Sequence, residues 1–144
     1  MSVSTLIPRL GGCNLRLSNE LDFADSKEHM PKISVVIPAY NGANFLAESL
    51  SSLARQTFRD FEVVLVDDGS SDGTAEIADR FSGEMRMRVL VNSKNIGVAA
   101  SLNRGIAETD SLLIARLDSD DLAHPDRLNQ QFTFMEASPD MGVY

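Results

Sequence analysis

Runs of apolar, mostly β-branched residues alternate with helical patterns from Lys32 onward, and this alternation predicts an α/β domain. Three runs, 33–37, 61–66 and 111–117, predict buried strands, and 89–91 predicts a further short strand. Pro38 ends the first run. Apolar residues recur at helical spacing between and after these runs, at Leu46, Leu50 and Leu53, at Ile77 and Phe81, at Val98, Leu102 and Ile106, and at Leu128, Phe132 and Met135. Strands that alternate with helices indicate βαβ units and a parallel sheet.

The two ends of the chain depart from this pattern. Residues 1–30 show no sustained period of 2 or 3.6, and we expect them to be a disordered leader that precedes one domain at 31–144. Residues 141–144 have the pattern of another strand's start, so we expect a C-terminally truncated domain. Copies would then associate through the open sheet edge, over apolar faces formed by Val35, Ile37, Val64, Val66 and Ile114.

The composition narrows the classes of function. Lys plus Arg number 13 and Asp plus Glu number 21, which gives a net charge of −8. This balance argues against nucleic acid or an anionic membrane as the main partner, because both require a cationic face. Cys13 is the single cysteine, so an internal disulfide and a cysteine-based zinc cluster are excluded. With no long apolar stretch and no signal-peptide core in the sequence, we expect a cytoplasmic location.

An acidic loop at 67–74 follows the second predicted strand. Asp67 and Asp68 are adjacent there, and their mutual repulsion must be offset by a helix N-terminus, a ligand donor or solvent. Successive side chains in an extended chain point to opposite sides, so the two carboxylates need not share a task. One interpretation is a turn with capping acids, Asp72 among them. The other is that one carboxylate accepts hydrogen bonds from a nucleobase or a ribose.

A second acidic loop, at 117–121, leaves the fourth predicted strand at the same edge of the sheet. If this loop is extended, Asp118 and Asp120 lie on one side and suit a hard divalent ion, Mg²⁺ or Mn²⁺. Such an ion would also reconcile an acidic protein with an anionic nucleotide. The alternative is a solvated acidic turn. His124 is either a further metal ligand or a helix-start residue, and we favour the latter.

Two further loops open at this edge. In the loop at 92–97, Gly97 permits close approach of backbone to a ligand, Asn95 tolerates turn geometry, and Lys94 could reach a phosphate. A plain turn explains these residues equally well. Tyr40, in the loop that follows the first predicted strand, could stack on a base or pack beside the sheet.

Taken together, in this order and spacing, the motifs resemble those of family 2 glycosyltransferases, inverting enzymes with the GT-A fold. The resemblance covers the chain from about Ile33 to Tyr144. The matching segments are 35–41, 66–74, 95–97, 103–105, 117–121 and 124–128. It implies a GT-A-type, Rossmann-like three-layer sandwich with a mainly parallel sheet.

The resemblance also implies roles for single residues in binding a nucleotide-sugar donor. Pro38, Ala39 and Tyr40 would border the nucleobase, and Asp68 would accept a hydrogen bond from it, commonly from uracil. We include Asn95 and Gly97 of the neighbouring loop among the donor-binding residues.

The metal site implied by the resemblance is the Asp-x-Asp motif. Asp118 and Asp120 match this motif, with Asp120 the expected ligand of a Mn²⁺ or Mg²⁺ ion on the diphosphate and Asp118 also in contact with the donor. Asp121 would support the loop. The catalytic base is expected beyond Tyr144, because neither Asp126, Glu136 nor Asp140 matches the family's position.

The implied activity is transfer of a sugar, from a UDP-sugar in the first instance, to a hydroxyl of a glycan or lipid-linked acceptor with inversion. Synthesis of polysaccharide, lipopolysaccharide or another cell-surface glycan is the expected setting, in the cytoplasm or peripheral to the inner face of the membrane. We expect this chain alone to bind nucleotide without transferring sugar.

Three other classes of protein share some of these features. A phosphoacceptor receiver domain carries its acidic pair after the first strand, whereas Asp67 and Asp68 follow the second. A nucleotidyltransferase has a basic, glycine-rich loop after its first strand, and residues 38–44 contain no Lys or Arg. A non-catalytic nucleotide-binding domain remains as a third alternative.

Overall fold

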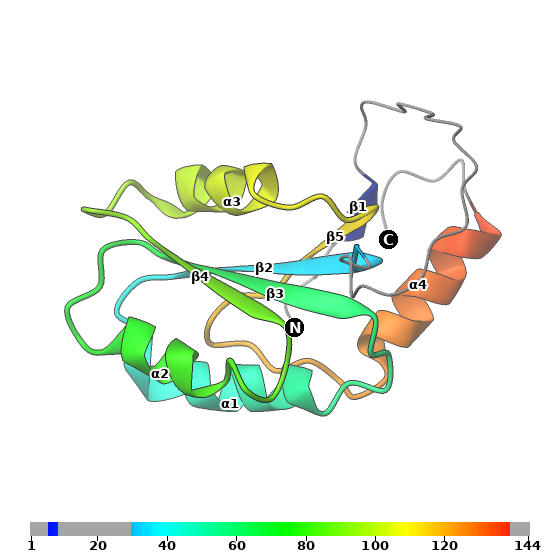
Figure 1. Cartoon of the computed structure of the whole chain (residues 1–144), viewed down its shortest axis with the longest axis horizontal. Coiled ribbons are helices and arrows are strands. Elements are labelled where there is room, and N and C mark those ends of the chain that lie inside the picture. The colour runs from blue at the N-terminus through cyan, green and yellow to red at the C-terminus, as the bar shows by residue number, and fades with distance from the viewer. Residues whose placement is uncertain (1–5, 9–29, 139–144) are drawn as a thin grey trace, which may run out of the picture.

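In the computed structural model, which describes residues 6–8 and 30–138, the chain forms one five-stranded sheet with helices on both faces (Figure 1). The strands lie in the order β1-β5-β2-β3-β4. Four of them are parallel, and their bounds are β2 (Ile33–Ala39), β3 (Phe61–Asp67), β4 (Met87–Val91) and β5 (Leu113–Arg116). The helices are α1 (Ala43–Ala54), α2 (Thr74–Arg80), α3 (Val98–Ala107) and α4 (Arg127–Ala137). The predicted α/β sandwich with a mainly parallel sheet is confirmed.

The two faces of the sheet are covered by different helices. Alternate residues of β2, beginning at Ile33, belong to the core cluster on the side of α1, α2 and α4. The opposite face packs against α3, where a Cβ built on Gly105 would lie 2.5 Å from a methyl carbon of Val36. Gly105 therefore lets α3 lie directly on the sheet. Figure 1 shows α3 alone on its face, with α1 and α2 on the other.

Pro38 lies inside β2 rather than after it, contrary to the expectation that it ends the strand. Its register partner is Val66 of β3, and Ala39 extends the strand by one more residue, opposite Asp67. The carbonyl of Val36 accepts a hydrogen bond from the backbone N–H of Leu117. The backbone groups of Val36, and of Pro38 two residues later, therefore point toward β5. The β2–β5 ladder ends at the pair Val36–Arg116, two residues before Pro38, so the missing N–H of proline breaks no ladder hydrogen bond.

The outer edge of β5 pairs with a further strand, β1 (Leu6–Pro8), which runs antiparallel to it. These three residues belong to the expected leader, so regular structure begins before residue 30; residues 1–5 and 9–29 lie outside the described part. The expectation of an uncovered apolar face is wrong, because all five residues named for it are buried: Val35, Ile37, Val64, Val66 and Ile114. The argument for association through that edge therefore falls, and the strand expected at 141–144 lies outside the described residues.

The last helix is anchored on the first. The side chain of Gln56 donates to the carbonyl of His124 and accepts from the backbone N–H of Leu128, the second residue of α4. Phe58 and Phe132 pack with ring centroids 4.9 Å apart. These contacts hold the segment between β5 and α4 against the C-terminal end of α1. Within the described ranges, no helix is long and apolar enough to cross a membrane.

Candidate functional site

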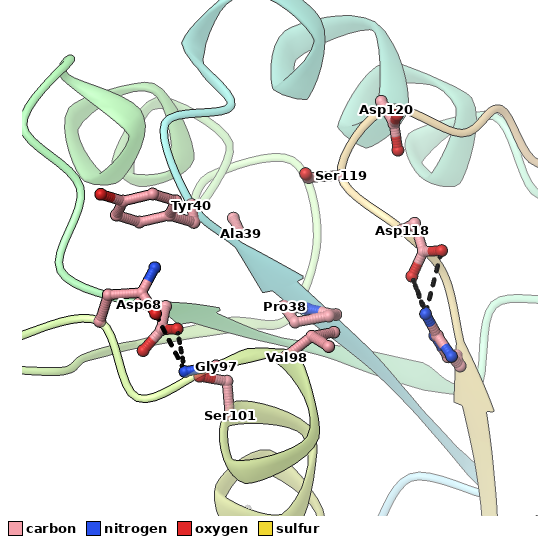
Figure 2. A pocket seen from close by; sticks show the side chains of 12 residues that line it. Pro38, Ala39, Tyr40, Asp68, Gly97, Val98, Ser101, Asp118, Ser119 and Asp120 are labelled. Atoms are coloured by element: carbon pink, nitrogen blue, oxygen red, sulfur yellow. Dashed lines mark hydrogen bonds and ion pairs between the residues drawn. The ribbon is translucent and has the colours of Figure 1, made fainter.

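A pocket of about 340 Å³ opens where the parallel strands end. Its lining comes from the end of β2, the residue after β3, the start of α3, and the end of β5 with the loop after it. The lining residues are Pro38, Ala39, Tyr40, Asp68, Asn95, Gly97, Val98, Ser101, Arg116, Asp118, Ser119 and Asp120. In Figure 2, Tyr40 and Asp68 lie on one side, Asp118 and Asp120 on the other, with Pro38 between them.

Asp68 connects the end of β3 to the start of α3. Its side chain is buried, and one carboxylate oxygen accepts hydrogen bonds from the Asn92 side chain at 2.7 Å and from the Ile96 backbone N–H at 2.9 Å. The second oxygen accepts from the backbone N–H of Gly97 at 2.8 Å (Figure 2). Because Gly97 is the residue directly before α3, Asp68 satisfies one of the free N–H groups of that helix's first turn.

These hydrogen bonds decide the charge of Asp68. Burial by itself raises the pKa of a carboxyl, but the donors Ile96, Asn92, Gly97 and Ser101 outweigh burial and hold the pKa of Asp68 below its ordinary value. Asp68 is therefore ionised at neutral pH. An ionised carboxylate can accept about four hydrogen bonds. The bonds from Asn92, Ile96 and Gly97 and the nearby hydroxyl of Ser101 hold this carboxylate in place at the pocket wall.

Asp67 has a separate task, as the alternation of adjacent side chains predicts. It is also buried, and its carboxylate accepts from the backbone N–H of Ser70 at 3.1 Å, which closes the turn after β3. Gly69 in this turn has φ +75°, and a Cβ there would lie 2.8 Å from the backbone of Lys94. The absence of a side chain thus allows the loops after β3 and β4 to touch.

Asp72 connects the loop after β3 to the start of α1 by hydrogen bonds. Its carboxylate accepts from the backbone N–H of Ala43, the first residue of α1, at 3.0 Å, and from that of Thr74, the first residue of α2, at 3.1 Å. The hydroxyl of Thr74 in turn accepts from the N–H of Gly42. Hydrogen bonds from Thr74 and Ala43 lower the pKa of Asp72. Asp72 is not the N-cap of α2, which is Gly73, but its carboxylate does accept from the first N–H groups of two helices, α1 and α2.

The second acidic segment is a turn, not the extended chain that the sequence argument assumed. The backbone N–H of Asp121 donates to the carbonyl of Asp118 at 3.1 Å. Asp118 is held by Arg116, whose Nε donates to one carboxylate oxygen at 2.9 Å and whose Nη2 donates to the other at 3.1 Å. The side chain of Asp120 is exposed, and no residue in the described ranges forms a hydrogen bond or an ion pair with it.

Behind this turn, Arg127 fills the space between β5 and α4. Its Nη2 donates to the carbonyl of Arg116 at 2.9 Å, and its other guanidinium nitrogens are buried. Burial lowers the pKa of Arg127, and the negative charge of Asp121 opposes that shift. The Asp121 carboxylate therefore interacts electrostatically with Arg127, and its role in supporting the loop stays a prediction. His124 accepts from the backbone N–H of Asp126 at 3.3 Å and is a helix-start residue.

The family model for glycosyl transferase family 2 matches residues 34–144. This chain belongs to that family. The match covers the four parallel strands, from the second residue of β2 onward, and every residue that lines the pocket.

Two individual proteins illustrate the similarity. Bacillus subtilis EpsE, a protein named as a glycosyltransferase, is 40% identical over 108 residues, which are 74% of this chain and 39% of that relative. The crystal structure of S. aureus TarS 1–349 in complex with UDP is 31% identical, with a TM-score of 0.71, over 74% of this chain and 32% of that one. This chain therefore spans less than half the length of either.

A third comparison concerns the fold alone. The mannosyltransferase PcManGT from Pyrobaculum calidifontis, solved in complex with GDP-Man and Mn²⁺, matches with a TM-score of 0.69 and 24% identity, over 81% of this chain and 36% of that chain. These structural neighbours are GT-A glycosyltransferases, and the family 2 chain has the GT-A arrangement that the resemblance implied.

All eight site residues that the sequence singled out in this family 2 chain line the one pocket. Sequence reasoning missed four others, Val98, Ser101, Arg116 and Ser119. Val98 was assigned to an apolar helix face, although it stands at the start of α3, where a helix meets the ligand-binding edge. Arg116 stands two residues before Asp118. Side chains at this spacing lie on the same side of an extended chain, so the spacing could have identified Arg116 as a pocket residue. Lys94 is absent from the pocket lining.

Proposed function

We propose that this chain is the donor-binding part of a glycosyltransferase that uses a UDP-sugar and transfers its sugar, with inversion, to an acceptor hydroxyl. One observation carries the proposal. A single pocket has an aromatic ring and a hydrogen-bond acceptor for a nucleobase on one side, at Tyr40 and Asp68, and two carboxylates on the other side, at Asp118 and Asp120. The relative TarS, solved both with UDP and with UDP-GlcNAc, supports the choice of nucleotide.

The base side suits uracil. Tyr40 is 53% exposed, so its ring can offer a face for stacking, and Pro38 and Ala39 lie beside it in the lining. The ionised carboxylate of Asp68, which lines the pocket, would accept a hydrogen bond from the imide N–H of uracil. Cytosine has no N–H at that ring position, so it would face the carboxylate with an acceptor and bind more weakly.

The carboxylate side suits a divalent ion together with a diphosphate. Within the described part of the chain, no group of three Asp, Glu, His or Cys side chains is arranged to hold a metal ion. An ion such as Mn²⁺ or Mg²⁺ fits two carboxylates when phosphates and water supply its other ligands. Asp120 is free to ligate, and Asp118 lies beside it in the lining. Such an ion would stabilise the negative charge of the departing diphosphate.

Asp126 is a carboxylate near the acidic turn, but its surroundings do not suit a catalytic base. Asp126 does not line the pocket; its carboxylate accepts from Thr57, Asn129 and Gln130, bonds that lower its pKa and fix it at the start of α4. We propose that the base that activates the acceptor lies beyond the described residues, and that a glycan or lipid-linked acceptor of a cell-surface glycan is the substrate.

A titration of nucleotides tests the proposal. Isothermal calorimetry of UDP, GDP and CDP against the chain, with Mn²⁺ or with EDTA, should show UDP binding that is weak, specific and dependent on the metal. Equal affinity for UDP in Mn²⁺ and in EDTA would contradict the metal site. Absence of UDP binding under both conditions would contradict the proposal as a whole.

A further inference from the structure

Arg116 and Asp118 form an ion pair inside the pocket rather than on an unrelated surface. Nε and Nη2 of Arg116 each donate to a different oxygen of Asp118, at 2.9 and 3.1 Å (dashed lines at Asp118 in Figure 2). The pair is accessible to solvent, with side-chain exposures of 48% for Arg116 and 33% for Asp118. Both carboxylate oxygens of Asp118, which could otherwise ligate a metal ion, thus already accept hydrogen bonds from the guanidinium of Arg116.

The position of Arg116 in the sheet directs its side chain toward the pocket. Arg116 is the register partner of Val36, and in a parallel sheet paired residues project from the same face. Val36 projects toward α3, where it meets Gly105, so Arg116 projects to that face too. Pro38, which lines the pocket, is two residues beyond Val36 and also lies on that face.

The charges of the lining give Arg116 a particular importance. Asp68, Asp118 and Asp120 line the pocket, and Arg116 is the one lysine or arginine among its lining residues. Arg116 would therefore be the one positively charged side chain of the lining that a bound diphosphate could contact. A guanidinium binds a carboxylate and a phosphate with the same two-pronged geometry, so exchange between them needs only a change of side-chain rotamer.

We propose that Arg116 is a positioning residue with two alternative partners. In the nucleotide-free pocket it pairs with Asp118 and keeps that carboxylate from a divalent ion. When the donor binds, Arg116 transfers its hydrogen bonds to the diphosphate, and Asp118 becomes available to the metal. The inference rests on the proposed function, because it takes the ligand to be a nucleoside diphosphate bound with a metal ion.

The experiment measures two affinities in the whole chain. Mn²⁺ binding without nucleotide is followed by the electron paramagnetic resonance signal of free Mn²⁺, and UDP binding at saturating Mn²⁺ by calorimetry. In Arg116→Gln, Mn²⁺ should bind about fivefold more tightly, since an exposed ion pair contributes up to about that factor. UDP should bind about tenfold more weakly, since a charge-assisted hydrogen bond to the diphosphate is lost.

Two further variants separate this role from a structural one. Arg116→Lys keeps the charge without the two-pronged geometry and should recover part of the UDP affinity. Arg88→Gln removes another exposed arginine from a pair with a carboxylate, that of Glu62, outside the pocket lining, and should leave both affinities unchanged. Loss of a structural contact would weaken both affinities together, whereas the proposal requires opposite signs.

Each remaining outcome has a distinct meaning. If the unsubstituted chain binds Mn²⁺ and UDP but Arg116→Gln changes neither affinity, or weakens both, the inference is wrong and the proposed function stands. If the unsubstituted chain binds UDP with no dependence on metal, the metal site of the proposed function is wrong and the exchange of partners falls with it.

Discussion

Asp68 accepts a 2.8 Å hydrogen bond from the backbone N–H of Gly97, and this contact joins the end of β3 to the start of α3 across 29 residues of sequence. The same carboxylate lines the pocket, so one side chain both shapes the site and takes part in it. Substitutions at this position therefore affect fold and ligand together, and experiments must separate the two effects.

The substitution Asp68→Asn replaces one acceptor oxygen by an N–H₂ donor that faces backbone N–H groups. A buried polar group left without a partner costs about 1–3 kcal/mol, so the free energy of unfolding in urea should fall by that amount. The preference for UDP over GDP and CDP should also fall, while the dependence on Mn²⁺ persists. Asp79→Asn, an exposed change on α2, is the control for stability. An unchanged preference among the nucleotides would refute base recognition by Asp68.

The pH dependence of stability should carry the signature of Asp68. Its pKa is lowered in the folded state, so the ionised form stabilises the fold above the ordinary pKa of about 4. That contribution is lost as the pH falls below about 4 and through the lowered folded-state value. Urea unfolding between about pH 6 and about pH 2 should therefore show a steeper acid loss for the unsubstituted chain than for Asp68→Asn. Parallel curves would mean that other carboxylates carry the acid transition.

Gly105→Ala should test the close packing of α3 on the sheet. The new Cβ would lie 2.5 Å from Val36 and 3.0 Å from Val66, and overpacking of this kind costs about 1–3 kcal/mol. That loss should exceed the gain of up to about 1 kcal/mol from alanine's higher helix propensity. Gly83→Ala, where nothing lies within 4 Å of the added carbon, is the matched control. UDP affinity should fall for Gly105→Ala alone, because the start of α3 lines the pocket.

The two neighbouring carboxylates of the acidic turn should behave differently. Asp120→Ala should remove most of the metal-dependent part of UDP binding in calorimetry, since Asp120 lines the pocket and is free of other partners within the described residues. Asp121→Ala should act less on metal dependence and more on thermal stability, because its charge offsets the burial of Arg127. Equal loss of metal-dependent binding in both variants would show that the turn acts only as a unit.

Much of the fold follows from local pattern. The β-branched runs at 33–37 and 61–66 predict buried strands because a parallel sheet that is covered on both faces needs apolar residues at every position, and β2 and β3 are buried along their whole length. The site residues could be gathered from sequence for a related reason. Parallel strands end at one edge, so acidic loops that follow different strands meet there.

The remaining features depend on residues that are distant in sequence. Pro38 continues β2 because the ladder with β5 has ended, which no pattern within β2 reveals. Leu6–Pro8 forms a strand because β5 offers an unpaired edge, not because its own three residues have a strong preference. The apolar residues expected to be exposed, such as Ile114, are buried by the tertiary arrangement.

By itself, then, the sequence predicted the α/β class, because that class depends on local periodicity, and its motifs predicted the family and eight of the twelve residues that line the pocket. The tertiary structure alone decided how the charges are paired. Asp68 draws its donors from Asn92, Ile96 and Gly97, more than 20 residues away, and Asp72 accepts a hydrogen bond from Ala43 across 29 residues. Hydrogen bonds are short and directional, so their partners are fixed only when the packed backbone brings donor and acceptor within about 3 Å.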